Sequence, residues 1–122
     1  MAPPDELPRF IRSSFRSVWS LELLLLLKRD SRPWSHAELL AGLRASDLIV
    51  SQSLEALTAA GLVALDAAGA ATYSPVSDGA GRLVDETEQL YAKSPDAVRR
   101  QIVSASAGGL AAFADAFRLR KD

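Results

Sequence analysis

Cysteine is absent from this 122-residue chain, and histidine occurs only once, as His36. The lack of cysteine excludes disulfide bonds, thiolate nucleophiles and cysteine-bound zinc, and a single histidine excludes a histidine-rich metal site. The most apolar run covers only residues 23–27, whereas a membrane-spanning helix needs about 20 apolar residues. The first residues show no basic stretch followed by an apolar one, so the sequence predicts no secretory signal and a cytoplasmic protein without a membrane partner.

A strong charge of either sign is also lacking. The chain has 14 Lys and Arg against 15 Asp and Glu, a net charge of −1, which indicates no overall preference for a polyanion. Apolar residues make up 48% of the chain, too many for a disordered one. The length suits one domain. We expect a single domain over residues 1–122, with a loose arm over 1–8, a core over 9–76 and C-terminal helices over 77–122.

Three helices are predicted in the first half of the core. Apolar residues at helical spacing predict one helix from Arg9 to Lys28, and the second half of this helix is apolar nearly all round, which is typical of a central, buried helix. Ser35 and Glu38 match the capping-box pattern and predict a short helix that ends near Arg44. A third helix follows a tight turn.

The third helix is expected to begin at Ser46 or Asp47, whose side chains can cap it, and to end at Gly61. A short apolar run over residues 62–66 and a second run over 71–74 flank a turn rich in alanine and glycine, which predicts a small β-hairpin. The core therefore consists of three helices followed by this hairpin.

The remaining residues predict further helices. Asp78 is a plausible cap for a helix through Lys93, and Ser94 followed by Pro95 is typical of the start of another helix, which we expect to run to about Val103. Leu110, Phe113 and Phe117 then form a final apolar stripe.

The order of these elements, with Leu54–Val63 as the end of a helix that runs directly into a strand, resembles the MarR-like winged helix-turn-helix regulators. The resemblance implies a mainly α fold with a small β-hairpin, in which the third helix enters the major groove of double-stranded DNA. It also implies a small transcriptional regulator. Mapped onto this chain, the residues that would contact DNA are Arg29, Arg32, Arg44, Ser46, Ser51, Gln52 and Ser53.

One feature departs from this family pattern. Residues 46–76 contain no Lys or Arg, and their three acidic residues, Asp47, Glu55 and Asp66, give the stretch a charge of 0 − 3 = −3. Lys and Arg that neutralise phosphates supply most non-specific DNA affinity, so the arginines outside this stretch would have to supply the phosphate contacts. The alternative interpretation is a winged-helix module that binds a protein and not DNA.

The terminal segments carry apolar residues that suit a subunit interface. The resembled regulators dimerise through terminal helices, which implies a homodimer. The expected interface residues are Phe10, Ile11, Phe15, Leu110, Phe113 and Phe117. Packing of these residues within one chain is the remaining possibility.

No pattern predicts an enzyme, a cofactor or a metal site. The best candidates for a pair of catalytic carboxylates are Asp85, Glu86 and Glu88. Because the side chains of neighbouring positions on a helix diverge, we expect these residues not to form one catalytic site. Gly108 and Gly109 match no phosphate-binding loop, and no serine lies in a nucleophile motif. His36 is expected to be an ordinary surface residue.

The arginines at positions 9, 12 and 16 recur at a spacing that would place them on one helical face. They predict a phosphate-binding stripe, a docking strip for an acidic partner, or simply a solvated helix end.

Overall fold

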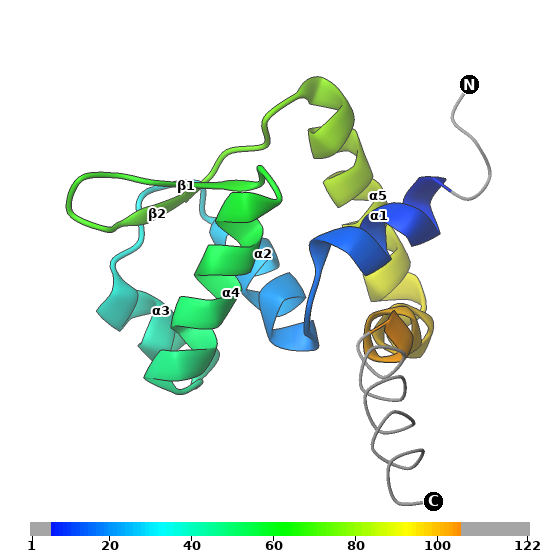
Figure 1. The fold of residues 1–122 in the computed structure, drawn as a ribbon, viewed down its shortest axis with the longest axis horizontal. Coiled ribbons are helices and arrows are strands. Elements are labelled where there is room, and N and C mark those ends of the chain that lie inside the picture. The colour runs from blue at the N-terminus through cyan, green and yellow to red at the C-terminus, as the bar shows by residue number, and fades with distance from the viewer. Residues whose placement is uncertain (1–5, 106–122) are drawn as a thin grey trace, which may run out of the picture.

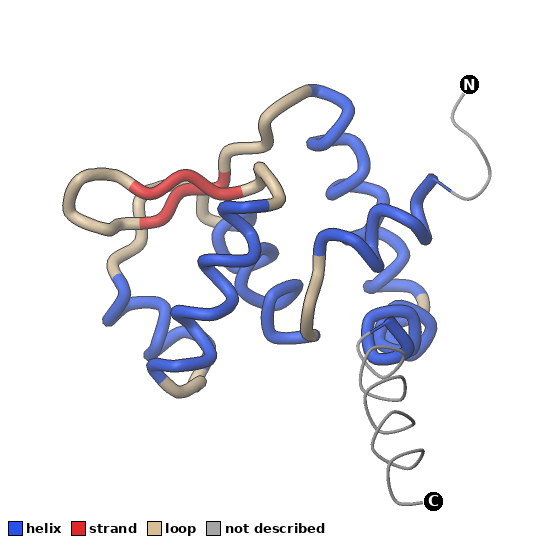
Figure 2. The backbone as a smooth tube through the Cα atoms, in the orientation of Figure 1, coloured by secondary structure: helices blue, strands red, loops and turns tan. Residues whose placement is uncertain are grey.

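The computed structural model describes residues 6–105, which are mainly helical and include a two-stranded antiparallel sheet (Figures 1 and 2). This agrees with the predicted mainly α fold with a small hairpin. The elements are α1 (Glu6–Ser14), α2 (Val18–Arg29), α3 (His36–Leu43), α4 (Asp47–Ala59), β1 (Val63–Leu65), β2 (Ala71–Tyr73), α5 (Asp78–Lys93) and a further helix over residues 95–105.

Helix α2 is the centre of the structure, as predicted. Its leucines at positions 21, 23, 24, 25 and 27 are all at most 1% exposed. Because these leucines point in different directions around the helix, α2 contacts α3, α4 and β2. The central position of α2 holds the other elements of the first half of the chain in place.

The prediction of one continuous helix from Arg9 to Lys28 is wrong, because the chain breaks between α1 and α2. Ser17 has an extended backbone, and its side chain accepts a hydrogen bond from the backbone N–H of Ser20, which starts α2 afresh. The break allows α1 to pack on α5, where it buries Ile11. Residues 6–8 belong to α1, so the loose arm predicted over residues 1–8 does not extend to them.

The corner between α3 and α4 forms as the sequence predicts. Ser35 and Glu38 make both hydrogen bonds of a capping box at the start of α3. Arg44 ends α3 in a left-handed conformation with φ of 54°, and the Ser46 side chain then caps α4 by accepting from the backbone N–H of Ile49. The two helices therefore meet across a short turn.

The predicted hairpin is present directly after α4. Gly61 has a φ of 76°, which ends the helix and turns the chain into β1. Strand β1 pairs with β2 in antiparallel register, with Leu65 opposite Ala71. The Asp66 carboxylate closes the loop by accepting hydrogen bonds from the backbone N–H groups of Ala68 and Ala70.

The last two described helices differ in detail from the prediction. The cap of α5 is Ser77, and Asp78 is instead the first helical residue. The helix that follows buries Val98 and Ile102, one turn apart. Within residues 6–105, no helix combines the length and the apolar character needed to cross a membrane.

Candidate interaction surface

The outer face of α4 is the surface that the sequence singles out, and the structure exposes most of it. Ser46, Asp47, Ser51, Gln52 and Glu55 are exposed, and we define them as the outer face of α4. The opposite side of the helix is buried against α2. The outer face is therefore available to a partner.

Ser53 does not belong to this face, although it was predicted to contact DNA. Its exposed fraction is only 3%. Ser53 lies three residues after Val50 and four before Leu57, so helical periodicity places it on the buried stripe of α4. Ser53 therefore lies on the buried side of α4 and not on its outer face.

A groove of about 570 Å³ runs between α4 and the hairpin, and we name it the α4–hairpin groove. Its lining residues include Ser51, Leu54, Glu55, Ala59, Leu65 and Gly69. Leu65 is 46% exposed even though it lies in a strand. The groove therefore offers apolar contact area next to the polar outer face.

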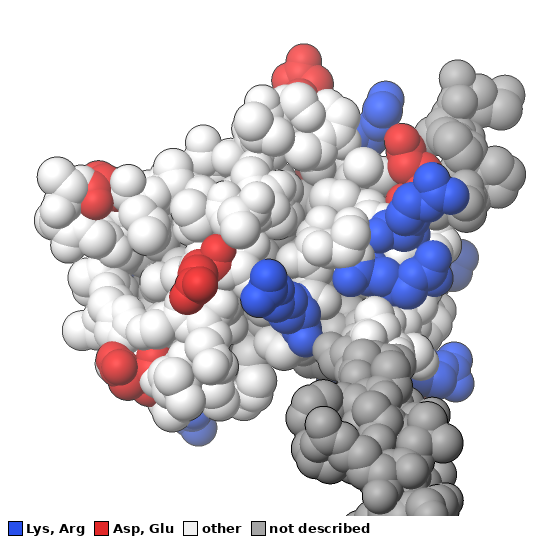
Figure 3. All heavy atoms as spheres, in the orientation of Figure 1, with Lys and Arg blue, Asp and Glu red and all other residues white. Residues whose placement is uncertain are grey.

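The charges around this groove are acidic. Asp47 lies at the start of α4, Glu55 in its middle and Asp66 at the hairpin loop, and no Lys or Arg lies between residues 46 and 76. In Figure 3, most of the basic atoms gather over α1 and its surroundings, and one basic group lies at the lower edge of the α3–α4 half. Acidic atoms lie over both halves of this view.

His36 and Asp47 connect the starts of two helices. The His36 Nε2 atom lies 2.5 Å from an Asp47 carboxylate oxygen, which links α3 to α4. His36 is partly exposed rather than fully on the surface. The two residues are eleven positions apart, and no local sequence signal indicates their contact.

Arg32, one of the arginines expected to bind phosphates, already interacts with other side chains of the chain. Its Nε donates to Asp30 at 2.9 Å, and its Nη1 lies 3.1 Å from a carboxylate oxygen of Glu38. Its guanidinium also stacks on the ring of Trp34 at 4.1 Å from the centroid. The hydrogen bond to Asp30 is the main cause of a raised Arg32 pKa. A phosphate would have to compete with two carboxylates for this side chain.

The other two predicted arginines, Arg29 and Arg44, lie at the ends of helices. Arg29 is the last residue of α2, and Arg44 follows α3 in the turn that leads to α4. Arg32 precedes α3 and Arg44 follows it, so these two residues flank opposite ends of that helix. Of the three, only Arg44 is adjacent along the chain to the outer face of α4.

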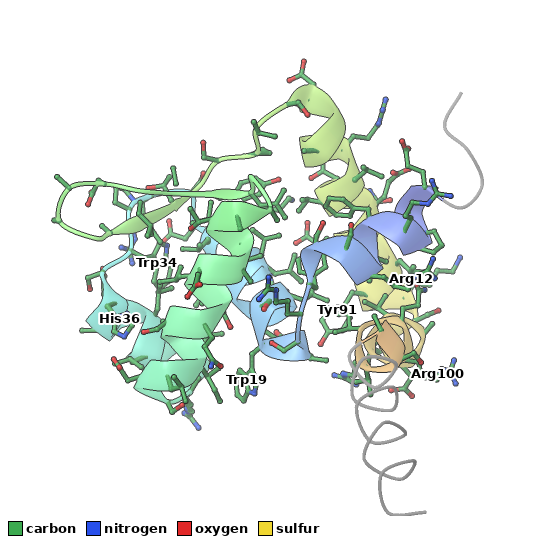
Figure 4. The ribbon with its side chains drawn as sticks, in the orientation of Figure 1. Arg12, Trp19, Trp34, His36, Tyr91 and Arg100 are labelled. Atoms are coloured by element: carbon green, nitrogen blue, oxygen red, sulfur yellow. The ribbon has the colours of Figure 1, made fainter. Side chains whose placement is uncertain are left out.

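The arginines near the N-terminus are divided by the break after α1. Arg9 and Arg12 lie on α1, whereas Arg16 lies in the link to α2, so the three do not form one helical stripe. Arg16 instead borders a hollow of about 450 Å³ that also touches Gln52 and Glu55 of α4. Figure 4 shows Arg12 and Arg100 on the α1 side of the molecule, away from Trp34 and His36.

The predicted interface residues near the N-terminus are core residues of the chain. Ile11 is 0% exposed and Phe15 is 1% exposed, and the ring of Phe10 packs edge-on against Phe15. Ile11 and Phe15 are therefore covered within one chain, whereas Phe10 is half-buried and keeps part of its surface exposed. The other predicted interface residues, Leu110, Phe113 and Phe117, lie outside the described residues.

The carboxylates on α5 do converge, contrary to prediction, but on a cation. Lys28 donates to Glu88 at 2.6 Å and lies 3.2 Å from Asp85. Asp85 and Glu88 are three positions apart and so share a helix face, whereas the adjacent residues Asp85 and Glu86 diverge. The hydrogen bond to Glu88 is the largest cause of a raised Lys28 pKa. This cluster ties α5 to α2.

A second polar cluster joins the same two helices. The Tyr91 hydroxyl donates to a carboxylate oxygen of Glu22, and the Arg99 guanidinium stands 5.5 Å from the Tyr91 ring. Burial, followed by the hydrogen bond to Glu22, raises the pKa of Tyr91. Within residues 6–105, no group of three or more His, Asp or Glu side chains is arranged to hold a metal ion.

Comparisons of the chain with models of known protein families, with curated proteins and with solved structures give no match. The resemblance to winged-helix regulators therefore stays a prediction from the sequence.

Proposed function

We propose that this chain is a winged-helix module that docks a protein through the outer face of α4 and the α4–hairpin groove, and that this surface does not bind DNA. The element order of two capped helices across a turn, followed by a hairpin, supports the winged-helix assignment. The acidic, cation-free character of residues 46–76 is the observation that carries the proposal.

The physical argument rests on phosphate charge. A winged helix bound to DNA places this face in the major groove, between the phosphates of the two strands, where neutralisation of phosphates by Lys and Arg releases counterions and supplies affinity. Here Asp47, Glu55 and Asp66 would face phosphates of the same sign. The Arg32 guanidinium is paired with the carboxylates of Asp30 and Glu38. It could bind a phosphate only by giving up these ion pairs. The apolar lining of the groove favours a protein partner instead.

A small transcriptional regulator is the second candidate, and the exposure of Ser46, Ser51 and Gln52 favours it. Serine and glutamine side chains can form hydrogen bonds with base edges, and Arg44 lies in the turn that leads to this helix. For both candidate functions we propose, from the sequence, that the protein is cytoplasmic and is not an enzyme.

A DNA-binding titration separates the two candidates. We expect fluorescence anisotropy of labelled double-stranded DNA at about 50 mM salt to show no salt-sensitive binding of the wild-type chain up to about 10 µM. The double variant Ser51→Arg/Glu55→Arg reverses the charge of the outer face and is expected to gain such binding. The variant Glu86→Arg/Gln89→Arg makes the same charge change at exposed positions of α5 and is the matched control.

The opposite result has a clear meaning. Micromolar, salt-sensitive binding of the wild-type chain that Arg44→Ala weakens would overturn protein docking by this face and support the DNA-binding regulator. Equal gains of binding in both arginine variants would show that charge at the outer face of α4 has no special role.

A further inference from the structure

The α4–hairpin groove places specific demands on its occupant. Leu65 and Ala59 are exposed along it, so the occupant gains by presenting apolar side chains. Glu55 lines the groove, and Asp66 lies in the loop that also supplies Gly69, so cations on the occupant would be attracted. A segment with an apolar stripe and adjacent Lys or Arg meets both demands.

The chain carries such a segment at its own C-terminal end. Leu110, Phe113 and Phe117 repeat at spacings of three and four residues. Residues 110–121 contain three basic residues, Arg118, Arg120 and Lys121, and one acidic residue, so their charge is 3 − 1 = +2. The charge of residues 46–76 is −3, the opposite sign.

The groove of the same copy lies on the other side of the molecule from the last described helix, over residues 95–105 (Figure 1). The helix over residues 95–105 lies beside α1 and α5, away from the hairpin (Figure 1). Residues 106–109 can span at most about 14 Å when fully extended, whereas a small domain is about 30 Å across. This arrangement favours the groove of a second copy as the binding site.

We propose that residues 110–121 of one copy bind in the α4–hairpin groove of a second copy. This inference rests on the proposed protein-docking function and names its partner. Phe113 and Phe117 supply the apolar contacts, while Arg118 and Arg120 interact with Glu55 and Asp66. When each copy inserts its segment into the other, the assembly closes as a dimer.

Disulfide trapping between two single-cysteine variants tests the proposal, because the natural chain has no cysteine to interfere. Ala59→Cys places a thiol at the groove, and Ala116→Cys places one beside Phe117. The control is Ala92→Cys, another exposed alanine on a helix, but on α5. We expect the Ala59→Cys and Ala116→Cys chains, mixed and oxidised, to form the mixed disulfide at least about tenfold faster than the control pair, as measured by intact mass.

Charge reversal provides a second readout on full-length chains. Glu55→Arg is expected to lower the fraction of dimer in sedimentation experiments, and Arg118→Glu in the same chain is expected to restore part of it. Failure of this rescue together with equal trapping rates for the two cysteine pairs would overturn the proposal. Rapid trapping within one chain that carries both cysteines, independent of concentration, would also overturn it, since the segment would then bind its own copy.

The two proposals fail in different ways. Salt-sensitive DNA binding by the wild-type chain overturns protein docking. Absence of DNA binding together with equal trapping rates overturns only the choice of a second copy as the partner.

Discussion

Ser17 shows how one side chain changes the path of this chain. Apolar residues continue at helical spacing on both sides of it, yet its hydroxyl accepts from the backbone N–H of Ser20 and starts a new helix. Gly61 acts at the other end of the core, where its φ of 76° turns α4 into β1. Ser17 acts through a side-chain hydrogen bond and Gly61 through its backbone conformation, and both effects are local to a helix end.

We predict that Gly61→Ala destabilises the protein by about 1–2 kcal/mol, because an L-residue is strained at this φ. The added Cβ would also stand 3.1 Å from a methyl carbon of Val76. Gly69→Ala is the control, since Gly69 has a φ of 85° but no heavy atom within 4 Å of such a Cβ. Chemical denaturation should show a larger loss at Gly61, and equal losses would contradict a role for the Val76 contact.

At the scale of single elements, α3 is a short helix that depends on its ends. It has eight residues, too few for stability from helix propensity alone, and its capping box supplies hydrogen bonds at the start. The backbone N–H of Ser35 donates a hydrogen bond to the Glu38 carboxylate at 2.9 Å. This hydrogen bond is the main reason why the pKa of Glu38 is lower than its ordinary value of 4.5.

The lowered pKa of Glu38 predicts a pH dependence of stability. Because folding favours the charged carboxylate, its contribution is fully present above pH 4.5 and is lost as the pH falls below 4.5 through the lowered pKa. The difference in free energy of unfolding between wild type and Glu38→Ala should therefore narrow between about pH 6 and about pH 3. Glu86→Ala, at an exposed position of α5, is the control. A difference that stays constant with pH would show that the carboxylate charge does not stabilise the cap.

At the scale of the whole molecule, α2 joins parts that are distant in sequence. It contacts α3, α4 and β2, and Lys28 and Glu22 connect it to α5 through Glu88 and Tyr91. The docking face and the α1–α5 half are thus both attached to one central helix.

We predict that Leu24→Ala destabilises the whole protein by about 2–5 kcal/mol, because Leu24 is 0% exposed and its removal leaves a cavity in the core. Leu48→Ala removes the same atoms from a leucine that is 63% exposed and should change stability by about 0.5 kcal/mol or less. Thermal and urea unfolding check both values. Similar losses for the two variants would mean that Leu24 is not central to the core.

Local signals in the sequence were sufficient where neighbouring residues decide the outcome. The capping box of Ser35 and Glu38, the cap at Ser46 and the turn at Gly61 each depend on groups within a few positions along the chain. For the same reason the hairpin and the buried leucines of α2 were predicted correctly. The acidic character of residues 46–76 is likewise a property of the sequence alone.

Only the tertiary structure decided which partners distant residues find. Helix α1 packs on α5 and contains the buried Ile11, and Lys28 of α2 draws Asp85 and Glu88 of α5 together. Most of these contacts join separate elements, and their energies depend on how the elements pack in three dimensions. Periodicity along the chain shows which face of a helix is apolar, but not which neighbour will cover it.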